Sequence, residues 1–123
     1  MIDKKIVIDL DQTIAFKGQS DDYSQCTPDF KVRERLIEYR KLGFAICIFT
    51  ARNMRKYDGN IGLINAVTLP VIIQWLTKHE IPFDEIIVGK PWCGESGFYV
   101  DDRAIRPDEF VKLSFKQIEK LLD

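Results

Sequence analysis

Two aspartates separated by one residue follow the first apolar stretch of the chain. Asp9 and Asp11 come directly after Ile6-Val7-Ile8, in the phrase Asp9-Leu10-Asp11-Gln12-Thr13. One aspartate there would be explained as a cap on the next turn. Two carboxylates this close repel each other unless a cation, or an anionic substrate with its cation, balances them. The pattern therefore indicates chemistry that uses a cation and an anion.

Polar residues of matching kinds follow three later apolar stretches. They are Thr50 with Arg52, then Lys90, then Asp101 and Asp102 with Arg103. The carboxyl ends of parallel strands meet at one edge of a sheet, so these groups are expected to converge. Hard oxygen ligands select Mg²⁺, and a magnesium ion and a lysine around one oxyanion are what phosphoryl transfer requires. The convergence predicts a Mg²⁺-dependent phosphoryl-transfer site.

Strands and helices are expected to alternate along the chain. Strands are predicted at residues 5–10, 44–49, 84–88 and 98–100, and helices from a Thr27 cap to Gly43, from a Thr68 cap to His79 and over residues 114–122. The helical predictions rest on capping residues followed by apolar spacing of three and four. Residues 51–66 are expected to be irregular. The alternation predicts a single α/β domain over residues 1–123, with a mainly parallel sheet and right-handed crossovers.

Composition excludes several classes of protein. The 123 residues are 46% hydrophobic and 30% charged, with 18 Lys and Arg against 19 Asp and Glu, for a net charge of -1. This balance argues against binding of duplex nucleic acid. The longest apolar run, residues 44–49, is far shorter than a membrane span, and no signal-peptide core is present. Three cysteines without paired spacing predict neither a disulfide framework nor a zinc site. We therefore expect a cytoplasmic protein without a membrane or nucleic-acid partner.

The ordered motifs resemble the haloacid dehalogenase (HAD) superfamily of aspartyl-phosphate phosphatases. The resemblance covers almost the whole chain. The phrases over residues 49–55, 89–94 and 98–103 are similar to a narrower group, the small capless bacterial phosphatases linked to capsular polysaccharide biosynthesis. This resemblance implies a three-layer Rossmann-like sheet with helices on both faces and no separate cap domain. The loops after Thr13 and Thr50 are also too short for a domain of their own.

The resemblance implies roles for four catalytic residues. Asp9 would be the nucleophile that becomes an aspartyl phosphate. Asp11 would protonate the leaving group and then activate water. Thr50 would hydrogen-bond a phosphoryl oxygen, and Lys90 would neutralise the nucleophile and the transferring group.

A metal site and a substrate site follow from the same resemblance. Asp9 and the main-chain carbonyl of Asp11 would hold Mg²⁺ with an acidic residue after the fourth strand, Asp102 in preference to Asp101. The residues expected to contact or support the substrate are Thr13, Arg52, Asn53, Trp92 and Arg103. Specificity would come from residues 52–64 and 92–97.

The sequence thus predicts a Mg²⁺-dependent phosphatase acting on a phosphomonoester. The expected substrate is a sugar phosphate or a related metabolite of capsule or surface-polysaccharide synthesis. Two alternatives stay open: a phosphoprotein phosphatase with the same chemistry, and a non-catalytic phosphate-sensing regulatory module. A homo-oligomer is also left open.

Overall fold

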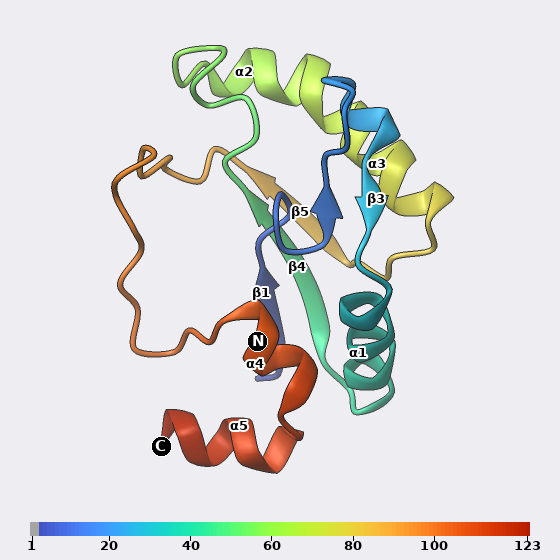
Figure 1. The fold of residues 1–123 in the computed structure, drawn as a ribbon, viewed down its shortest axis with the longest axis vertical. Helices are drawn as coiled ribbons and strands as arrows, with labels where there is room; N and C mark the ends of the chain where they lie inside the picture. The colour runs from blue at the N-terminus through green and yellow to red at the C-terminus, as the bar shows by residue number, and fades with distance from the viewer. Residues whose placement is uncertain (1–2) are drawn as a thin grey trace. The chain divides into compact units, whose positions relative to one another are not determined.

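The computed structural model describes residues 3–123, which form two compact units (Figure 1). The unit Met1–Trp92 contains β1 (Lys5–Ile8), β2 (Ala15–Phe16), the 3₁₀ turn η1 (Tyr23–Gln25), β3 (Thr27–Pro28), α1 (Phe30–Lys41), β4 (Ala45–Thr50), α2 (Ile61–Leu63), the π-helical turn η2 (Ile64–Thr68), α3 (Leu69–Lys78) and β5 (Glu85–Val88). The unit Cys93–Asp123 contains α4 (Pro107–Lys112) and α5 (Phe115–Leu122). The single domain over residues 1–123 stays a prediction.

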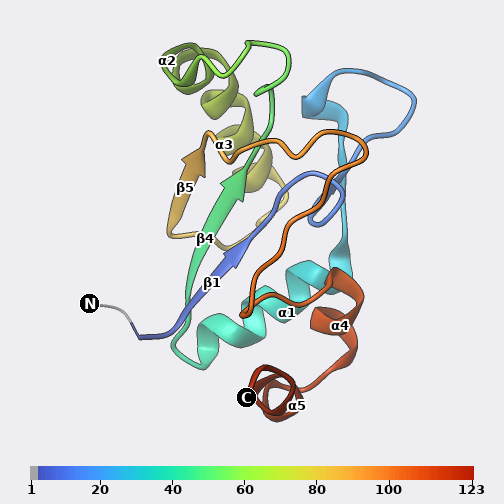
Figure 2. The same cartoon turned by 90° about the vertical axis from the view of Figure 1, so that its left-hand side faces the viewer.

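A three-stranded parallel sheet organises the first unit. Its order is β1-β4-β5, with Ile6 opposite Ile46 and Ile48 opposite Ile86. Ile46 and Ile48 are fully buried in the central strand, as expected for an apolar strand of a parallel sheet. Figure 2 shows the three arrows pointing the same way, so the three carboxyl ends share one edge. The predicted α/β class and parallel sheet are confirmed.

The two longer helices of this unit lie on the same side of the sheet (Figures 1 and 2). The register puts Val7 and Ile87 on one common face, in line with Cys47 and Phe49 of β4. Val7 and Ile87 remain exposed, at 60% and 48%. The three-layer arrangement with helices on both faces therefore stays a prediction.

The first helix begins two residues later than predicted. Asp29 is its N-cap and accepts hydrogen bonds from the backbone N–H groups of Lys31 and Val32, at 2.9 and 3.1 Å. The predicted cap, Thr27, instead pairs with Phe16 in a two-residue antiparallel ladder. The prediction was wrong because a strand that the sequence did not reveal takes up residues 27–28, and an aspartate is available to cap directly after it.

The second long helix begins eight residues before its predicted start. Asn60 caps it by accepting a bond from the backbone N–H of Leu63 at 3.1 Å. Thr68, the predicted cap, instead ends a π turn in which the N–H of Leu69 bonds to the carbonyl of Ile64, five residues earlier. Proline disrupts the regular i→i−4 ladder, and the widened turn directly before Pro70 accommodates it inside the helix.

The helix Ile61–Lys78 is apolar enough to cross a membrane when judged by length and composition alone. Its 18 residues have a mean hydropathy of 1.4, and no other such helix occurs within residues 3–123. A helix of the core of a soluble protein passes the same test. This one buries Ile72, Trp75 and Leu76 in the core of the first unit, and 28% of the 18-residue stretch is buried.

The predicted fourth strand is absent from the structure. Residues 98–100 are neither helix nor strand, and Phe98 and Val100 are 78% and 88% exposed. β propensity indicates only that a segment fits a pleated surface, and the strand itself forms through its partner. The prediction was wrong because these apolar residues pair with no strand in the described residues.

The last helix begins as the sequence predicts. Ser114 accepts a bond from the backbone N–H of Gln117, whose side chain accepts one from the N–H of Ser114, at 3.2 and 2.8 Å. This reciprocal pair is the capping box read from the sequence. The short helix α4 was not predicted, and its signal was the proline at its start, Pro107.

Candidate active site

Asp9 lies at the carboxyl edge of the sheet, one residue beyond β1. Its Oδ2 accepts a hydrogen bond from the hydroxyl of Thr13 at 2.9 Å, and its Oδ1 lies 3.5 Å from the ammonium of Lys90. The Asp9 side chain is 35% exposed, whereas that of Lys90 is 17% exposed. The carboxylate is thus held from two sides and still reachable from solvent.

A tight turn after β1 gives Asp9 and Asp11 their positions. The carbonyl of Leu10 accepts bonds from the N–H groups of Thr13, Ile14 and Ala15 at 3.3, 2.8 and 3.0 Å. Gln12 has φ of 67°, in the left-handed region that a residue other than glycine adopts only when its surroundings impose it. Leu10 and Ile14 are fully buried, so the turn is anchored in the core.

Lys90 reaches Asp9 across the central strand of the sheet. It follows β5, and β4 separates β5 from β1. Gly89 has φ of 84°, and a Cβ there would meet the Ile61 side chain at 2.5 Å. Glycine at 89 therefore lets the chain turn against the start of α2, and the N–H of Lys90 bonds to the carbonyl of Thr50 at 3.1 Å.

Thr50 is the last residue of β4 and is 1% exposed. Its hydroxyl oxygen accepts a hydrogen bond from the backbone N–H of Arg52 at 3.1 Å. Its placement beside Lys90 at the same sheet edge is what the sequence predicted. The hydroxyl hydrogen of Thr50 is a donor that an oxyanion at this edge would use.

Asp11 forms a bidentate ion pair with a buried arginine, Arg52. The Nη2 of Arg52 lies 2.8 Å from Asp11 Oδ1 and its Nε lies 3.1 Å from Oδ2, so both carboxylate oxygens are engaged. The Arg52 side chain is 1% exposed and that of Asp11 is 33% exposed. The Arg52 guanidinium carbon also lies 4.0 Å from the centre of the Tyr23 ring. Burial raises the pKa of the neighbouring Cys26 thiol, which keeps that group neutral.

Two further residues that were predicted to bind substrate, Asn53 and Trp92, also belong to the first unit. Asn53, with φ of 64°, donates from Nδ2 to the hydroxyl of the buried Thr68 at 2.7 Å, and so joins the loop after β4 to the helix that covers it. Trp92 is 49% exposed at the end of the unit.

The remaining predicted residues belong to the second unit. Asp101 accepts a bond from the backbone N–H of Arg103 at 2.8 Å, and Asp101, Asp102 and Arg103 are all exposed. Their roles in metal and substrate binding stay predictions.

The first unit supplies part of what a magnesium ion needs. The Asp9 carboxylate is a hard oxygen donor and is partly open to solvent. Within residues 3–123, however, no group of three or more His, Cys, Asp or Glu side chains is arranged to hold a metal. The donor chemistry of Asp9 and of the Asp11 carbonyl fits Mg²⁺, which commonly keeps several waters and takes only one or two carboxylates.

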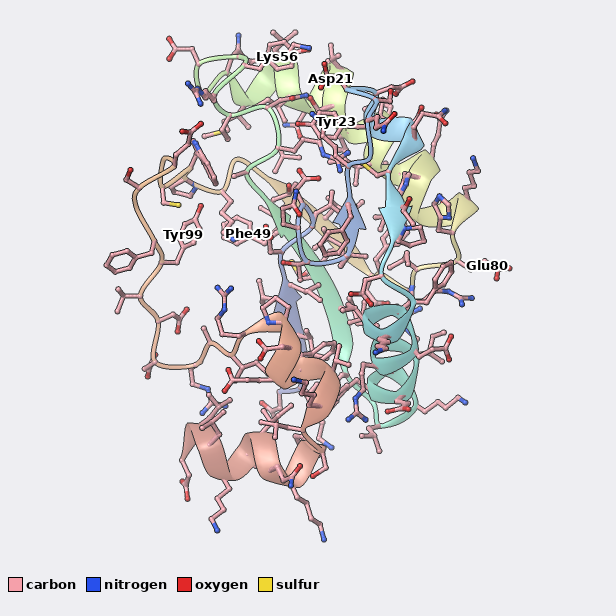
Figure 3. All side chains as sticks on the ribbon, in the orientation of Figure 1. Asp21, Tyr23, Phe49, Lys56, Glu80 and Tyr99 are labelled. Carbon is pink, nitrogen blue, oxygen red and sulfur yellow. The ribbon has the colours of Figure 1, made fainter. Side chains whose placement is uncertain are left out.

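Sequence reasoning missed Tyr23, which contacts the buried Arg52 from the loop between β2 and β3. Figure 3 labels this residue. The only signal in the sequence was an aromatic residue within an otherwise polar stretch, residues 17–25. An isolated aromatic of this kind carries no pattern that would place it beside Arg52.

Fold and site together define an α/β protein that carries carboxylates, a lysine and a threonine at the carboxyl edge of a parallel sheet. The crystal structure of an MCSG target from Vibrio cholerae is similar to this chain, with 53% sequence identity and a TM-score of 0.93. The match covers 97% of this chain and 96% of the other. The chain belongs to the same family as that Vibrio cholerae protein. No family model and no curated protein matches the chain.

Proposed function

We propose that this protein is a Mg²⁺-dependent phosphomonoester hydrolase of the HAD type that works without a cap domain. The observation that carries the proposal is the 3.5 Å approach of Lys90 to Asp9 across the sheet edge, with Asp11 two residues further on. A lysine beside a solvent-reachable carboxylate suits attack on a phosphate ester. The lysine offsets the negative charge of both the nucleophile and the phosphoryl oxygens.

In the first step Asp9 attacks the phosphorus through a carboxylate oxygen. The bond from phosphorus to the ester oxygen breaks, its electron pair stays on the leaving oxygen, and Asp11 supplies the proton that makes the leaving group an alcohol. Thr50 and Lys90 donate to the phosphoryl oxygens. Mg²⁺, when bound, supplies further positive charge at these oxygens.

In the second step water attacks the phosphorus of the aspartyl phosphate. Asp11, now a carboxylate, takes a proton from the water. The bond between phosphorus and the Asp9 oxygen breaks, which restores the Asp9 carboxylate and releases inorganic phosphate. Thr13 keeps the Asp9 carboxylate oriented through both steps by its 2.9 Å hydrogen bond.

The substrate class follows from the resemblance in residues 49–55, 89–94 and 98–103, and we assign a sugar phosphate or related metabolite of surface-polysaccharide synthesis. The test is a panel of sugar phosphates and phosphopeptides, assayed with Mg²⁺ and with p-nitrophenyl phosphate as a reference. Turnover of sugar phosphates well above phosphopeptides supports the assignment. Preference for phosphopeptides makes the protein a phosphoprotein phosphatase, and no turnover of any ester contradicts hydrolysis.

A further inference from the structure

We propose that Arg52 and Tyr23 are positioning residues that hold the acid–base residue Asp11, and that Arg52 acts on the reaction through Asp11 instead of binding substrate. This inference rests on the proposed function, because it assigns these residues to the same site. It is carried by two contacts of Arg52, one with Asp11 and one with Tyr23, and by the burial of the Arg52 side chain.

The first contact is the bidentate ion pair between Arg52 and Asp11, referred to below as the two-point grip. The Nε and Nη2 groups donate to separate carboxylate oxygens, at 3.1 and 2.8 Å. A planar guanidinium in this arrangement fixes both the position and the rotation of the carboxylate plane, which a lysine, with its single ammonium, does not do. Arg52 thus determines the direction in which Asp11 points.

The second contact is the stacking of Arg52 on Tyr23. The guanidinium carbon lies 4.0 Å from the ring centre, and the ammonium of Lys17 lies 4.5 Å from the same centre. Both are cation–π distances. Tyr23 therefore gives the guanidinium a flat support, and the loop that carries Tyr23 becomes part of the site.

The third observation is the burial of the arginine itself. Its side chain is 1% exposed, its backbone N–H is tied to the Thr50 hydroxyl, and its Nη1 is buried without a hydrogen-bond partner. A charge removed from water needs a nearby opposite charge, and Asp11 provides it. Two of the three guanidinium nitrogens are already engaged by Asp11, and Asp11, at 33% exposure, is the member of the pair that solvent reaches.

The grip also has a chemical consequence. Both oxygens of Asp11 accept bonds from Arg52 in this structure, so one of them has to be given up when Asp11 protonates a leaving group. The longer bond, from Nε at 3.1 Å, involves Oδ2. Arg52 would then keep Asp11 in place through Nη2 while Oδ2 exchanges the proton.

The kinetic test uses two aryl esters that differ in leaving group, p-nitrophenyl phosphate and phenyl phosphate. Phenyl phosphate needs more help from an acid. Loss of Arg52 through Arg52→Lys should raise the ratio of kcat/KM for p-nitrophenyl phosphate over phenyl phosphate about 10-fold or more, as loss of acid catalysis does. The double variant with Asp11→Asn should be no slower than Asp11→Asn alone. Equal losses on both esters that multiply with Asp11→Asn would instead make Arg52 a substrate contact and overturn the proposal.

Tyr23 supplies a matched pair of variants. Tyr23→Phe keeps the ring face that stacks on Arg52, so it should retain the wild-type ratio of the two esters. Tyr23→Leu removes the face and should shift the ratio in the same direction as Arg52→Lys. Similar ratios in Tyr23→Leu and wild type would contradict the supporting role of Tyr23.

Urea unfolding separates failure of this inference from failure of the proposed function. The Arg52→Lys and Asp11→Asn substitutions should shift the unfolding midpoint non-additively, because each disrupts the same two-point grip between Arg52 and Asp11. Additive shifts of the unfolding midpoint would contradict the proposed coupling between Arg52 and Asp11, even if the enzyme is active. Non-additive shifts in a protein that hydrolyses no ester would contradict the proposed function. The Arg52–Asp11 ion pair would then be a structural contact with no role in catalysis.

Discussion

The ammonium of Lys90 lies 3.5 Å from Oδ1 of Asp9, although the two residues follow strands that do not neighbour each other in the sheet. Lys90 reaches over the end of β4 because Gly89 turns the chain and because its own N–H is fixed to the carbonyl of Thr50. Three strand ends therefore contribute to one small polar cluster.

Replacement of Lys90 tests the electrostatic part of this cluster. Lys90→Ala should lower kcat on p-nitrophenyl phosphate by roughly 10²–10³-fold, the usual cost of losing one group that stabilises transition-state charge. Lys78→Ala, an exposed lysine at the end of α3, is the matched control and should leave kcat unchanged. A Lys90→Ala enzyme as fast as this control would remove Lys90 from the mechanism.

The Asp11→Asn substitution separates the two chemical steps. The substituted residue keeps its main-chain carbonyl at position 11. Its side-chain amide neither donates the leaving-group proton nor takes one from water. Hydrolysis of a sugar phosphate should fall by roughly 10²–10⁴-fold, whereas formation of the phosphoenzyme from p-nitrophenyl phosphate should survive better. Rapid-quench detection of protein-bound phosphate measures the difference. Equal loss on both substrates with no trapped phosphate would leave Asp11 a structural role only.

Removal of divalent cations tests the metal dependence. Excess EDTA should stop hydrolysis of p-nitrophenyl phosphate, and added Mg²⁺ should restore it, because Asp9 and the Asp11 carbonyl are hard oxygen donors. Circular dichroism of the EDTA-treated protein controls for unfolding. Full activity in EDTA would show that the carboxylates at this edge work without a metal.

Asp84 provides a prediction on the pH dependence of stability. Its pKa lies below the ordinary value of 3.8 because the backbone N–H of Ile46 donates to it at 2.7 Å, with Arg40 nearby at 2.9 Å. Since folding favours the carboxylate, the stabilisation is complete above pH 3.8 and is lost as pH falls through the folded-state pKa.

The Asp84→Asn variant should therefore unfold at lower urea concentration than wild type at pH 7. The difference between the two unfolding midpoints should shrink as pH falls below 3.8 and through the lowered pKa of Asp84, where wild type loses the charged form. Urea unfolding followed by circular dichroism over a pH series measures it. A difference between the two unfolding midpoints that stays constant with pH would show that the Asp84 charge contributes nothing to stability.

The sequence predicted the parts of the fold that local chemistry determines. The strands ending near Ile8, Thr50 and Val88 could be predicted because each is a short apolar run rich in β-branched residues, although only β4 is largely buried. The Ser114 capping box was readable because both of its bonds are local. The Asp9, Thr50 and Lys90 cluster followed from the rule that strand ends converge.

The parts that depend on tertiary structure, or on a helix start that was missed, were not predicted from the sequence. The π turn Ile64–Thr68 lies directly before Pro70, in a helix that begins at the Asn60 cap. The β2–β3 ladder pairs two segments that are each only two residues long and lie on either side of residues 17–26, too short for a strand pattern to show in the sequence. The contact between Tyr23 and Arg52 likewise depends on tertiary structure alone.

The most direct test of the central claim is identification of the phosphorylated residue. Wild-type protein mixed with p-nitrophenyl phosphate and Mg²⁺, quenched in acid and digested, should yield one phosphorylated peptide with the phosphate on Asp9. Asp9→Asn should fold normally by circular dichroism, yield no phosphopeptide and show no turnover, because the amide is a poor nucleophile and a poorer metal ligand. Near wild-type turnover by Asp9→Asn, with no phosphate on position 9 of the wild type, would contradict the covalent mechanism.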